Sequence, residues 1–322
     1  PETLVSELSI AERQFVEIAH GIKADASVVI LDEPTAALNS ADVEVLNRHI
    51  RRLRDEGKAI IYISHRMEEI FQICDTVTVL KDGRLAGTKP LSEVTPASLI
   101  ALMVGRELQD LFPPRGATAG DVVLQVDDFR IDAKGAPLSI RVCRGEIVAL
   151  AGLEGQGQQK LLRALVGQFQ PFSGTVRLKG EVLSMPVPPG AGIRRLQAAG
   201  VAFIPEDRKE EGLFLTLPVA HNLAIGLHSR RPGLSLARNY ARTIADTIRD
   251  LGIKAASPSV AANSLSGGNQ QKVLLGRYLA TKPEILLIEE PTRGVDVGAK
   301  SEIYRLLREF ANAGGAVLVL SR

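Results

Sequence analysis

The sequence has few cysteines, no marked excess of either charge and no long apolar run. Only Cys74 and Cys143 occur in 322 residues, and they are not spaced as C-x-x-C. This usage predicts a reducing compartment, no structural metal and two small, buried thiols. The 39 basic and 37 acidic residues lack the one-sided basic charge of a dedicated nucleic-acid binder. No run of about 18 apolar residues occurs, so no membrane-spanning segment is predicted.

What the sequence does contain is one block that occurs twice. The matching positions lie 257 residues apart without a gap: Leu8 and Ser9 with Leu265 and Ser266, Asp32-Glu33-Pro34-Thr35 with Glu289-Glu290-Pro291-Thr292, and Ser64 with Ser321. A fixed period predicts two copies of one structural unit. Each copy has a polar turn, a helix, an apolar strand ending in acids and a second apolar strand. This order is typical of the later part of a phosphate-handling α/β domain.

Two acids follow the first of these strands. Residues 28–31 are a short apolar run, which predicts a strand buried on both faces of a parallel sheet, and Asp32 and Glu33 come directly after it. Ligands of open α/β sheets bind beyond the carboxyl ends of strands, so these acids are candidates for magnesium and water chemistry. Taken alone, the pair fits a solvated turn equally well, and the repeat favours a site. Residues 59–63 predict a second buried strand, with His65 beyond its end.

Two domains are predicted, separated by a segment rich in proline, glycine and small residues. The first domain is residues 1–111, the linker 112–121 and the second domain 122–322. Hydrophobic periodicity and turn residues predict helices over 8–22, 41–56, 99–111, 160–165 and 217–251 with a break at 228–233, a hairpin over 76–88, and strands over 122–126, 138–142, 146–151 and 316–320.

The second domain contains a glycine-rich loop. The apolar strand at 146–151 leads into GLEGQGQQK, residues 152–160, and then into a helix. A strand, a glycine-rich turn and a helix in this order let backbone N–H groups converge on a phosphate. The spacing of the repeat places the counterpart of this loop before Pro1, so we expect the sequence to be a fragment of a longer chain.

Four motifs together resemble an ATP-binding cassette protein. They are LSGGNQQK at 265–272, ILLIEEPTRGVDVGAK at 285–300, VVILDEPTAAL at 28–38 and GLEGQGQQK at 152–160. The combination is most similar to the twin-cassette ATPases of bacterial ribose-, xylose- or galactose-type importers. The resemblance implies an α/β fold of two P-loop ABC-type nucleotide-binding domains, each with a parallel sheet core, an antiparallel β subdomain and a helical subdomain. The first would be truncated at its N-terminus and the second at its C-terminus.

The resemblance also implies a function and partners. ATP hydrolysis with Mg²⁺ would energise import of a monosaccharide, through transmembrane permease subunits and, indirectly, a periplasmic sugar-binding protein. The chain would lie at the cytoplasmic face of the inner membrane as a peripheral subunit, with no nucleic acid and no membrane contact except through the permease. The open alternatives are an importer ATPase for nucleosides or another small polar solute, and a soluble twin-cassette ATPase without a permease. The fragment alone is expected to be inactive.

By the same resemblance, individual residues receive roles. Asp32 would hold Mg²⁺ through water, Glu33 would be the general base, and His65 would sense the γ-phosphate. Asn39 lies where these cassettes carry a loop that couples the two sites. The nucleotide-binding candidates are Asp32, Asn39, Ser266, Gly267 and Gly268 for one composite site, and Gly152, Gly155, Gly157, Gln158, Gln159, Glu289 and Glu290 for the other.

The second copy has lost several groups of the first. Gln158 stands at the phosphate-binding lysine position, Gln159 at the Mg²⁺-binding hydroxyl, and Glu289 at the strand-end aspartate. Glu206 replaces a glutamine, and Arg322 replaces the switch histidine. The first copy's signature turn, residues 8–12, lacks both glycines. Because positioning and charge carry phosphoryl transfer, losing one group costs on the order of 10³-fold. We therefore expect one competent and one impaired site.

Three features are weaker candidates. Lys160 would reach a phosphate only if the loop were wound differently, and Phe129 is favoured as a core residue over an adenine platform. The segment 206–222 resembles the region that contacts the permease, and it fits a solvated loop equally well.

Overall fold

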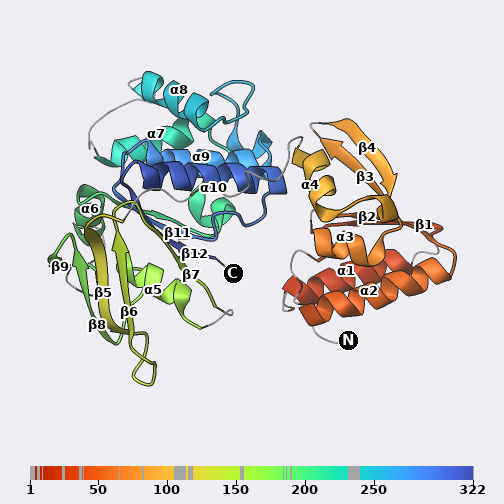
Figure 1. The fold of residues 1–322 in the computed structure, drawn as a ribbon, viewed down its shortest axis with the longest axis horizontal. Coiled ribbons are helices and arrows are strands. Elements are labelled where there is room, and N and C mark those ends of the chain that lie inside the picture. Colours follow the sequence, from red (N-terminus) through yellow and green to blue (C-terminus); the bar gives the residue numbers. More distant parts are fainter. Residues whose placement is uncertain are drawn as a thin grey trace. The chain divides into compact units, whose positions relative to one another are not determined.

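The computed structural model of the chain describes residues 4–5, 8, 10–23, 26–35, 38, 40–64, 66–81, 83–104, 114, 119–152, 156–183, 185, 187–188, 191–230 and 240–321. The chain divides into two compact units, Pro1–Leu108 and Gln109–Arg322 (Figure 1). The linker expected over 112–121 lies mostly outside the described residues, so its bounds stay a prediction. No helix in the described part combines the length and apolar character that crossing a bilayer requires.

The first unit is a small α/β assembly. Its elements are α1 (Ile10–Lys23), β1 (Val28–Asp32), α2 (Ser40–Asp55), β2 (Ala59–Ile63), α3 (Met67–Ile73), β3 (Thr76–Lys81), β4 (Arg84–Pro90), a 3₁₀ turn (Leu91–Glu93) and α4 (Pro96–Val104). β1 and β2 pair in parallel, with Asp32 opposite Ile63, and β3 and β4 form an antiparallel hairpin. The predicted helices, strands and hairpin are confirmed within a few residues, except that 105–111 lie outside the described part.

The expectation that β1 and β2 are buried on both faces is wrong for the described structure. Val29 and Leu31 are buried in a core that includes residues of α1 and α2. The other face is open, because Val28, Ile30 and Ile61 are 49%, 64% and 50% exposed. The alternation arises because helices of this unit cover only one face of the strand pair.

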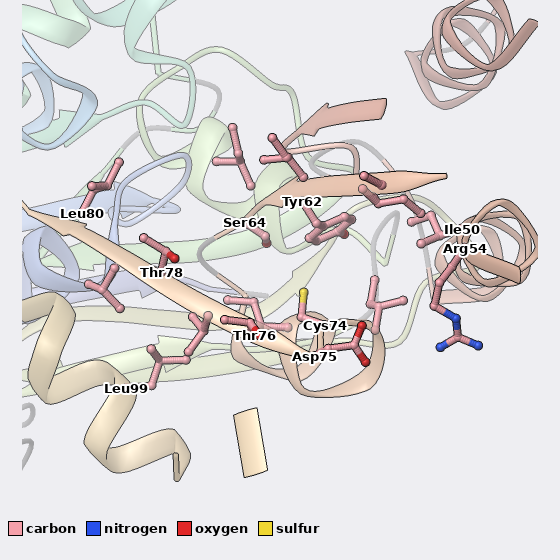
Figure 2. A pocket seen from close by; sticks show the side chains of 18 of the residues that line it. Ile50, Arg54, Tyr62, Ser64, Cys74, Asp75, Thr76, Thr78, Leu80 and Leu99 are labelled. Carbon is pink, nitrogen blue, oxygen red and sulfur yellow. The ribbon is translucent and has the colours of Figure 1, made fainter. Parts of the chain in front are cut away.

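A cavity lies on the open side of this unit (Figure 2). It has a volume of about 790 Å³ and is lined by all of β2 and most of β3, with Tyr62 and Ser64 on one side and Thr76 and Thr78 on the other. In the second unit, β12, the counterpart of β2, pairs with β7 along the edge that β11 does not occupy. Asp32 does not line the cavity, whereas Ser64, the neighbour of His65 in the chain, does.

The second unit has two sheets and a helical region. Its elements are β5 (Val122–Arg130), β6 (Leu138–Cys143), β7 (Ile147–Leu150), α5 (Gln158–Leu165), β8 (Ser173–Leu178), β9 (Glu181–Leu183), α6 (Ala191–Ala198), β10 (Val201–Ile204), a π-helical turn (Arg208–Gly212), α7 (Val219–Arg230), α8 (Ala241–Asp250), a 3₁₀ turn (Ala262–Ser264), α9 (Gly267–Leu279), β11 (Ile285–Glu289), α10 (Val297–Asn312) and β12 (Ala316–Leu320). One sheet is parallel, in the order β10-β11-β12-β7. The other is antiparallel, in the order β6-β5-β8-β9.

Both faces of the parallel sheet are covered. Leu286 and Ile288 of β11 belong to a core with α9 and α10, which lie over the sheet in Figure 1. Ile285 and Leu287 belong to a second core with α5 and the antiparallel strands. All five residues of β11 are therefore buried. Burying one such side chain contributes about 1.5–3 kcal/mol, so the sheet is the stable platform of this unit.

The predicted elements of the second unit are confirmed with two shifts. α5 begins at Gln158, two residues earlier than expected, because Gly157 adopts a left-handed φ of 102° and caps the helix. α7 continues to Arg230, through the start of the predicted break at 228–233. His228 packs edge-on against Tyr240, with ring centroids 5.1 Å apart, and this contact joins the end of α7 to the start of α8.

Both cysteines are half-buried, which corrects the expectation that they lie in the core. Cys74 caps the end of α3 and lines the cavity, and Cys143 ends β6. Partial burial, reinforced by Asp75 beside Cys74 and Glu146 beside Cys143, raises the pKa of each thiol. The thiols are therefore held in the protonated form, which is a poor nucleophile.

Candidate functional site

The two acids predicted in the first unit lie at the carboxyl end of β1. Asp32 is the last residue of the strand and is exposed. Glu33 follows it with a φ of 46°, a left-handed conformation that costs energy for any residue except glycine. Its backbone N–H donates to the Ile63 carbonyl at 2.9 Å, which fixes this turn to the end of β2.

A buried glutamate that the sequence analysis missed holds the surroundings of these acids. Glu69 of α3 is 5% exposed and accepts hydrogen bonds from Thr35 Oγ1 at 2.7 Å and Tyr62 Oη at 2.7 Å. It also accepts from Ser64 Oγ at 3.1 Å and pairs with Arg66 at 3.3 Å. Burial of the Tyr62 hydroxyl, together with its hydrogen bond to Glu69, raises the pKa of Tyr62. Glu69 therefore joins the segment after β1 to the segment after β2.

Three predicted site residues, Asn39, His65 and Gly155, lie outside the described residues. Ser64 and Arg66, which flank His65 in the chain, are both bound by Glu69. The sequence signal for the contacts of Glu69 was its position four residues after His65, in the first turn of a helix.

The second unit repeats the backbone of the first at the second acid. Glu290 has a φ of 41°, and its N–H donates to the Leu320 carbonyl at 2.9 Å. Glu33 and Ile63 make the same contact at the same distance in the first unit. The two copies therefore share not only sequence but also the strained turn at this position.

In the glycine-rich loop of the second unit, Gly157 has a left-handed backbone that favours glycine. Gly152 and Gly157 have φ values of 159° and 102°. A Cβ at Gly157 would lie 2.0 Å from Ile131 Cδ1, and one at Gly152 would lie 2.0 Å from Gln158 Nε2. Because β7, β10 and β11 are parallel strands of one sheet, the loop and the acids after β10 and β11 gather at one edge.

A buried ion-pair network lies at this edge of the second unit. Glu289 is fully buried, and Arg163 of α5 binds it with both arms of its guanidinium: Nε donates to Oε1 at 3.0 Å and Nη2 to Oε2 at 2.9 Å. Gln159 Nε2 donates to Glu206 at 3.3 Å and more weakly to Glu289 at 3.5 Å. Arg163 also pairs with Glu211 at 2.9 Å. The bond to Glu289 raises the pKa of Arg163, so the guanidinium stays charged.

The two strand ends differ in whether they suit a magnesium ion. Asp32 is an exposed carboxylate, and none of the described residues forms an ion pair with it. Carboxylate oxygen is a ligand that Mg²⁺ prefers, so this residue fits the ion. In the second unit, Gln159 and Glu289 stand at the positions of the Mg²⁺-binding hydroxyl and the strand-end aspartate, and both are hydrogen-bonded to each other and to Glu206. With Arg163 holding Glu289, these residues do not fit a magnesium ion.

Two of the weaker candidates of the second unit, Lys160 and Phe129, pack against other residues of this unit. Lys160 Nζ lies 5.6 Å from the centroid of the Phe169 ring, so the side chain packs beyond α5 and does not replace the missing lysine of the loop. Phe129 is 1% exposed within the core of the antiparallel sheet, as favoured from the sequence.

The signature turn of the second copy is the start of the LSGGNQQK motif at 265–272. It leads into α9, with Ser266 as the N-cap of the helix. Its glycines allow close packing: a Cβ at Gly267 would lie 2.8 Å from the Gly294 carbonyl oxygen, and one at Gly268 would lie 2.6 Å from Ala299 Cβ. The turn is therefore pressed against the segment that follows the second pair of acids.

Arg208 fixes the same segment and was also missed. Its guanidinium donates to the carbonyls of Arg293 at 2.7 Å and Gly294 at 2.9 Å. Burial lowers the pKa of Arg208. The preceding Asp207 accepts from the backbone N–H groups of Lys209 and Glu210, and the latter bond lowers the Asp207 pKa.

The sheet order and the strand–loop–helix passage into α5 give the second unit the fold of P-loop ABC ATPases. Residues 136–293 match the family described as ABC transporter. Two solved structures share the fold. An ATP-binding cassette of an ABC transporter in its ADP conformation has a TM-score of 0.52 at 20% identity, covering 63% of this chain and 82% of that one. CbiO1 from Clostridium perfringens has a TM-score of 0.52 at 21% identity, covering 62% and 78%.

Curated relatives match the chain from end to end. The ribose/galactose/methyl galactoside import ATP-binding protein 1 of Burkholderia cenocepacia (strain HI2424) is 42% identical over 324 residues, covering 100% of this chain and 61% of the relative. The ribose import ATP-binding protein RbsA 2 of Streptomyces avermitilis is 43% identical over 324 residues, covering 100% and 63%. The chain thus spans somewhat over three fifths of the length of these relatives.

Proposed function

We propose that the chain is part of an ATP-binding subunit that energises import of a monosaccharide, with one hydrolysing site and one impaired site. The names of the relatives support the sugar class. The observation that carries the division of labour is the contrast between an exposed Asp32 and a Glu289 closed off by Arg163. A subunit with two equal sites would have comparable acids at both strand ends.

The proposed organisation is a pair of cassettes. Residues 1–111 would be the later part of the first cassette, 112–121 the linker and 122–322 the second cassette. The identical turns at Glu33 and Glu290 support two copies of one fold. The complete protein would contain a phosphate loop in each cassette, and its greater length in the relatives agrees with this.

The chemistry of the competent site would use residues of both cassettes. Asp32 would hold Mg²⁺ through water, and the ion when bound neutralises phosphate charge. The Glu33 carboxylate would take a proton from the attacking water, and His65 would contact the γ-phosphate. Ser266, with the two glycines after it, would cap the nucleotide from the opposite cassette. Asn39 would couple the two sites.

The proposed partners are transmembrane permease subunits. The chain would bind them at the cytoplasmic face of the inner membrane. A periplasmic sugar-binding protein would act through the permease, without direct contact. The segment 206–222 of the second cassette is the proposed permease contact. Its π-helical turn, Arg208–Gly212, carries exposed charges. The nearby Phe214 is 54% exposed and adds an apolar side chain to this surface.

The test is purification of the tagged full-length protein with its membrane fraction, followed by ATP-driven uptake of labelled ribose and galactose into vesicles. We expect a multi-spanning protein to copurify and sugar uptake to require ATP. Uptake of nucleosides instead of sugars would change the cargo. A purely soluble ATPase with no membrane partner would overturn the proposal.

A further inference from the structure

The buried network of the second unit contains a cation supplied by the chain itself. We propose that Arg163 replaces magnesium at this site, so that the second unit binds ATP without a divalent ion. This inference rests on the proposed function and deepens its impaired site. It concerns how nucleotide is held there, a question separate from which sugar is imported.

The first step is the donors that surround Glu289. Three N–H groups point at Oε2: Arg163 Nη2 at 2.9 Å, the Glu206 backbone N–H at 3.4 Å and Gln159 Nε2 at 3.5 Å. One points at Oε1, from Arg163 Nε at 3.0 Å. Because the carboxylate is fully buried, a metal ion could reach it only by displacing these donors.

The second step is the balance of charge around the loop. Acids next to a nucleotide repel its phosphates unless a cation stands between them. Arg163 pairs with both Glu289 and Glu211, and Arg293 pairs with Glu206 at 2.5 Å. Arginine suits this task because its planar fork binds a carboxylate bidentately and never loses its charge. Two arginines therefore offset part of the charge of these three carboxylates before any nucleotide arrives.

The third step concerns the end of the glycine-rich loop, where α5 starts. Gly157 retains a left-handed backbone, and α5 begins directly after it. Backbone N–H groups at a helix start bind phosphate without help from a lysine. The residues lost from the loop, at Gln158 and Gln159, are those that serve the metal and the transferred phosphate. The backbone cradle does not depend on them.

The direct test is titration of the 322-residue chain with a fluorescent N-methylanthraniloyl ATP, once with Mg²⁺ and once with EDTA. The printed sequence contains one glycine-rich loop, so the binding curve reports on the second unit. We expect the two dissociation constants to agree within about threefold. Binding that weakens at least about tenfold in EDTA would overturn the inference, as would no binding in either buffer.

A variant pair makes the test specific to Arg163. In Arg163→Gln the acids lose their cation, so we expect binding in EDTA to fall at least about fivefold below binding with Mg²⁺. The matched control is Arg249→Gln, because Arg249 also pairs with two acids, Asp246 at 2.8 Å and Asp250 at 3.0 Å, but on the exposed surface of α8. The control should keep the metal independence of the parent chain.

The outcomes are assigned in advance. A folded Arg163→Gln variant that still binds equally in both buffers would contradict the role of Arg163. If its circular dichroism shows that it does not fold, Arg163→Lys replaces it, since lysine keeps the charge. Metal-independent binding by the lysine variant supports the inference, and metal-dependent binding overturns it. None of these results affects copurification with a permease or sugar uptake, so failure here is distinguishable from failure of the proposed function.

Discussion

The ends of β1 and β11 have the same backbone and opposite surroundings. Glu33 and Glu290 share a left-handed φ near 40–50° and the same 2.9 Å bond to the neighbouring strand. One residue earlier the copies diverge: Asp32 is exposed, whereas Glu289 is fully buried against Arg163. A repeated fold can thus preserve the turn that presents an acid while side chains from other elements cancel its chemistry.

The two copies also differ in how far their strands are buried. Leu318 of β12 is buried beneath α5 and the antiparallel sheet, whereas its counterpart Ile61 in β2 is 50% exposed. The apolar pattern of both strands is equally suitable for burial. Whether a face is buried depends on which other segments are present to cover it, and not on the strand itself.

The largest expected effect tests whether the two acids are functionally unequal. In the full-length protein assembled with its permease, Glu33→Gln should lower steady-state phosphate release by on the order of 10²–10³-fold, because it removes the proposed base. Glu290→Gln should change the rate by less than about twofold. Phosphate release at saturating Mg-ATP measures both. Equal losses would show that the sites share the work.

The next effect concerns stability around Glu289. Arg163→Ala leaves a buried carboxylate without its partner, which costs about 3–5 kcal/mol. Hydrogen exchange of the β11 peptide, measured by mass spectrometry, should show that Arg163→Ala lowers the protection of its backbone amides. Arg249→Ala removes two exposed pairs and should leave the protection nearly unchanged. If the two substitutions lower protection by the same amount, Arg163 does not support the buried carboxylate.

A smaller effect tests why only the second copy has signature glycines. Gly268→Ala would place a Cβ 2.6 Å from Ala299 Cβ, and such overpacking costs about 1–3 kcal/mol. Hydrogen exchange at the start of α9 should increase. The control is Gly87→Ala in β4, where an added Cβ meets nothing within 4 Å. Unchanged exchange in the α9 variant would remove internal packing as the reason for the glycine.

The smallest effect is a pH dependence confined to the second unit. Backbone N–H groups lower the pKa of Asp207, so its contribution to stability is complete above the ordinary aspartate pKa of about 3.9 and is lost as pH falls through the lower folded value. Amide NMR shifts of Lys209 and Glu210 should therefore change below about pH 4. Asp207→Asn should abolish this change. A titration centred above about pH 5 would contradict the assignment.

Much of the local structure could be predicted from the sequence. The constant spacing of the repeat identified the paired strands and the acids after them, and periodicity located α1 and α2 within a few residues. These features depend on neighbours in the chain or on residues at a fixed period. The residues that decide the site did not have such a signal. Arg163 and Glu289 are 126 positions apart, and an arginine on a helix is normally solvated.

The sequence alone determined that one block is duplicated, that acids follow a strand in each copy and that the second loop lacks a lysine and a hydroxyl. Repeated motifs and hydrophobic periodicity depend on positions along the chain, so they can be recognised from residue order. Only the tertiary structure decided that Arg163 closes Glu289, that Glu69 links the ends of β1 and β2, and that Lys160 packs on Phe169. Charges exert their effect through distance in space, and folding sets that distance independently of separation in the chain.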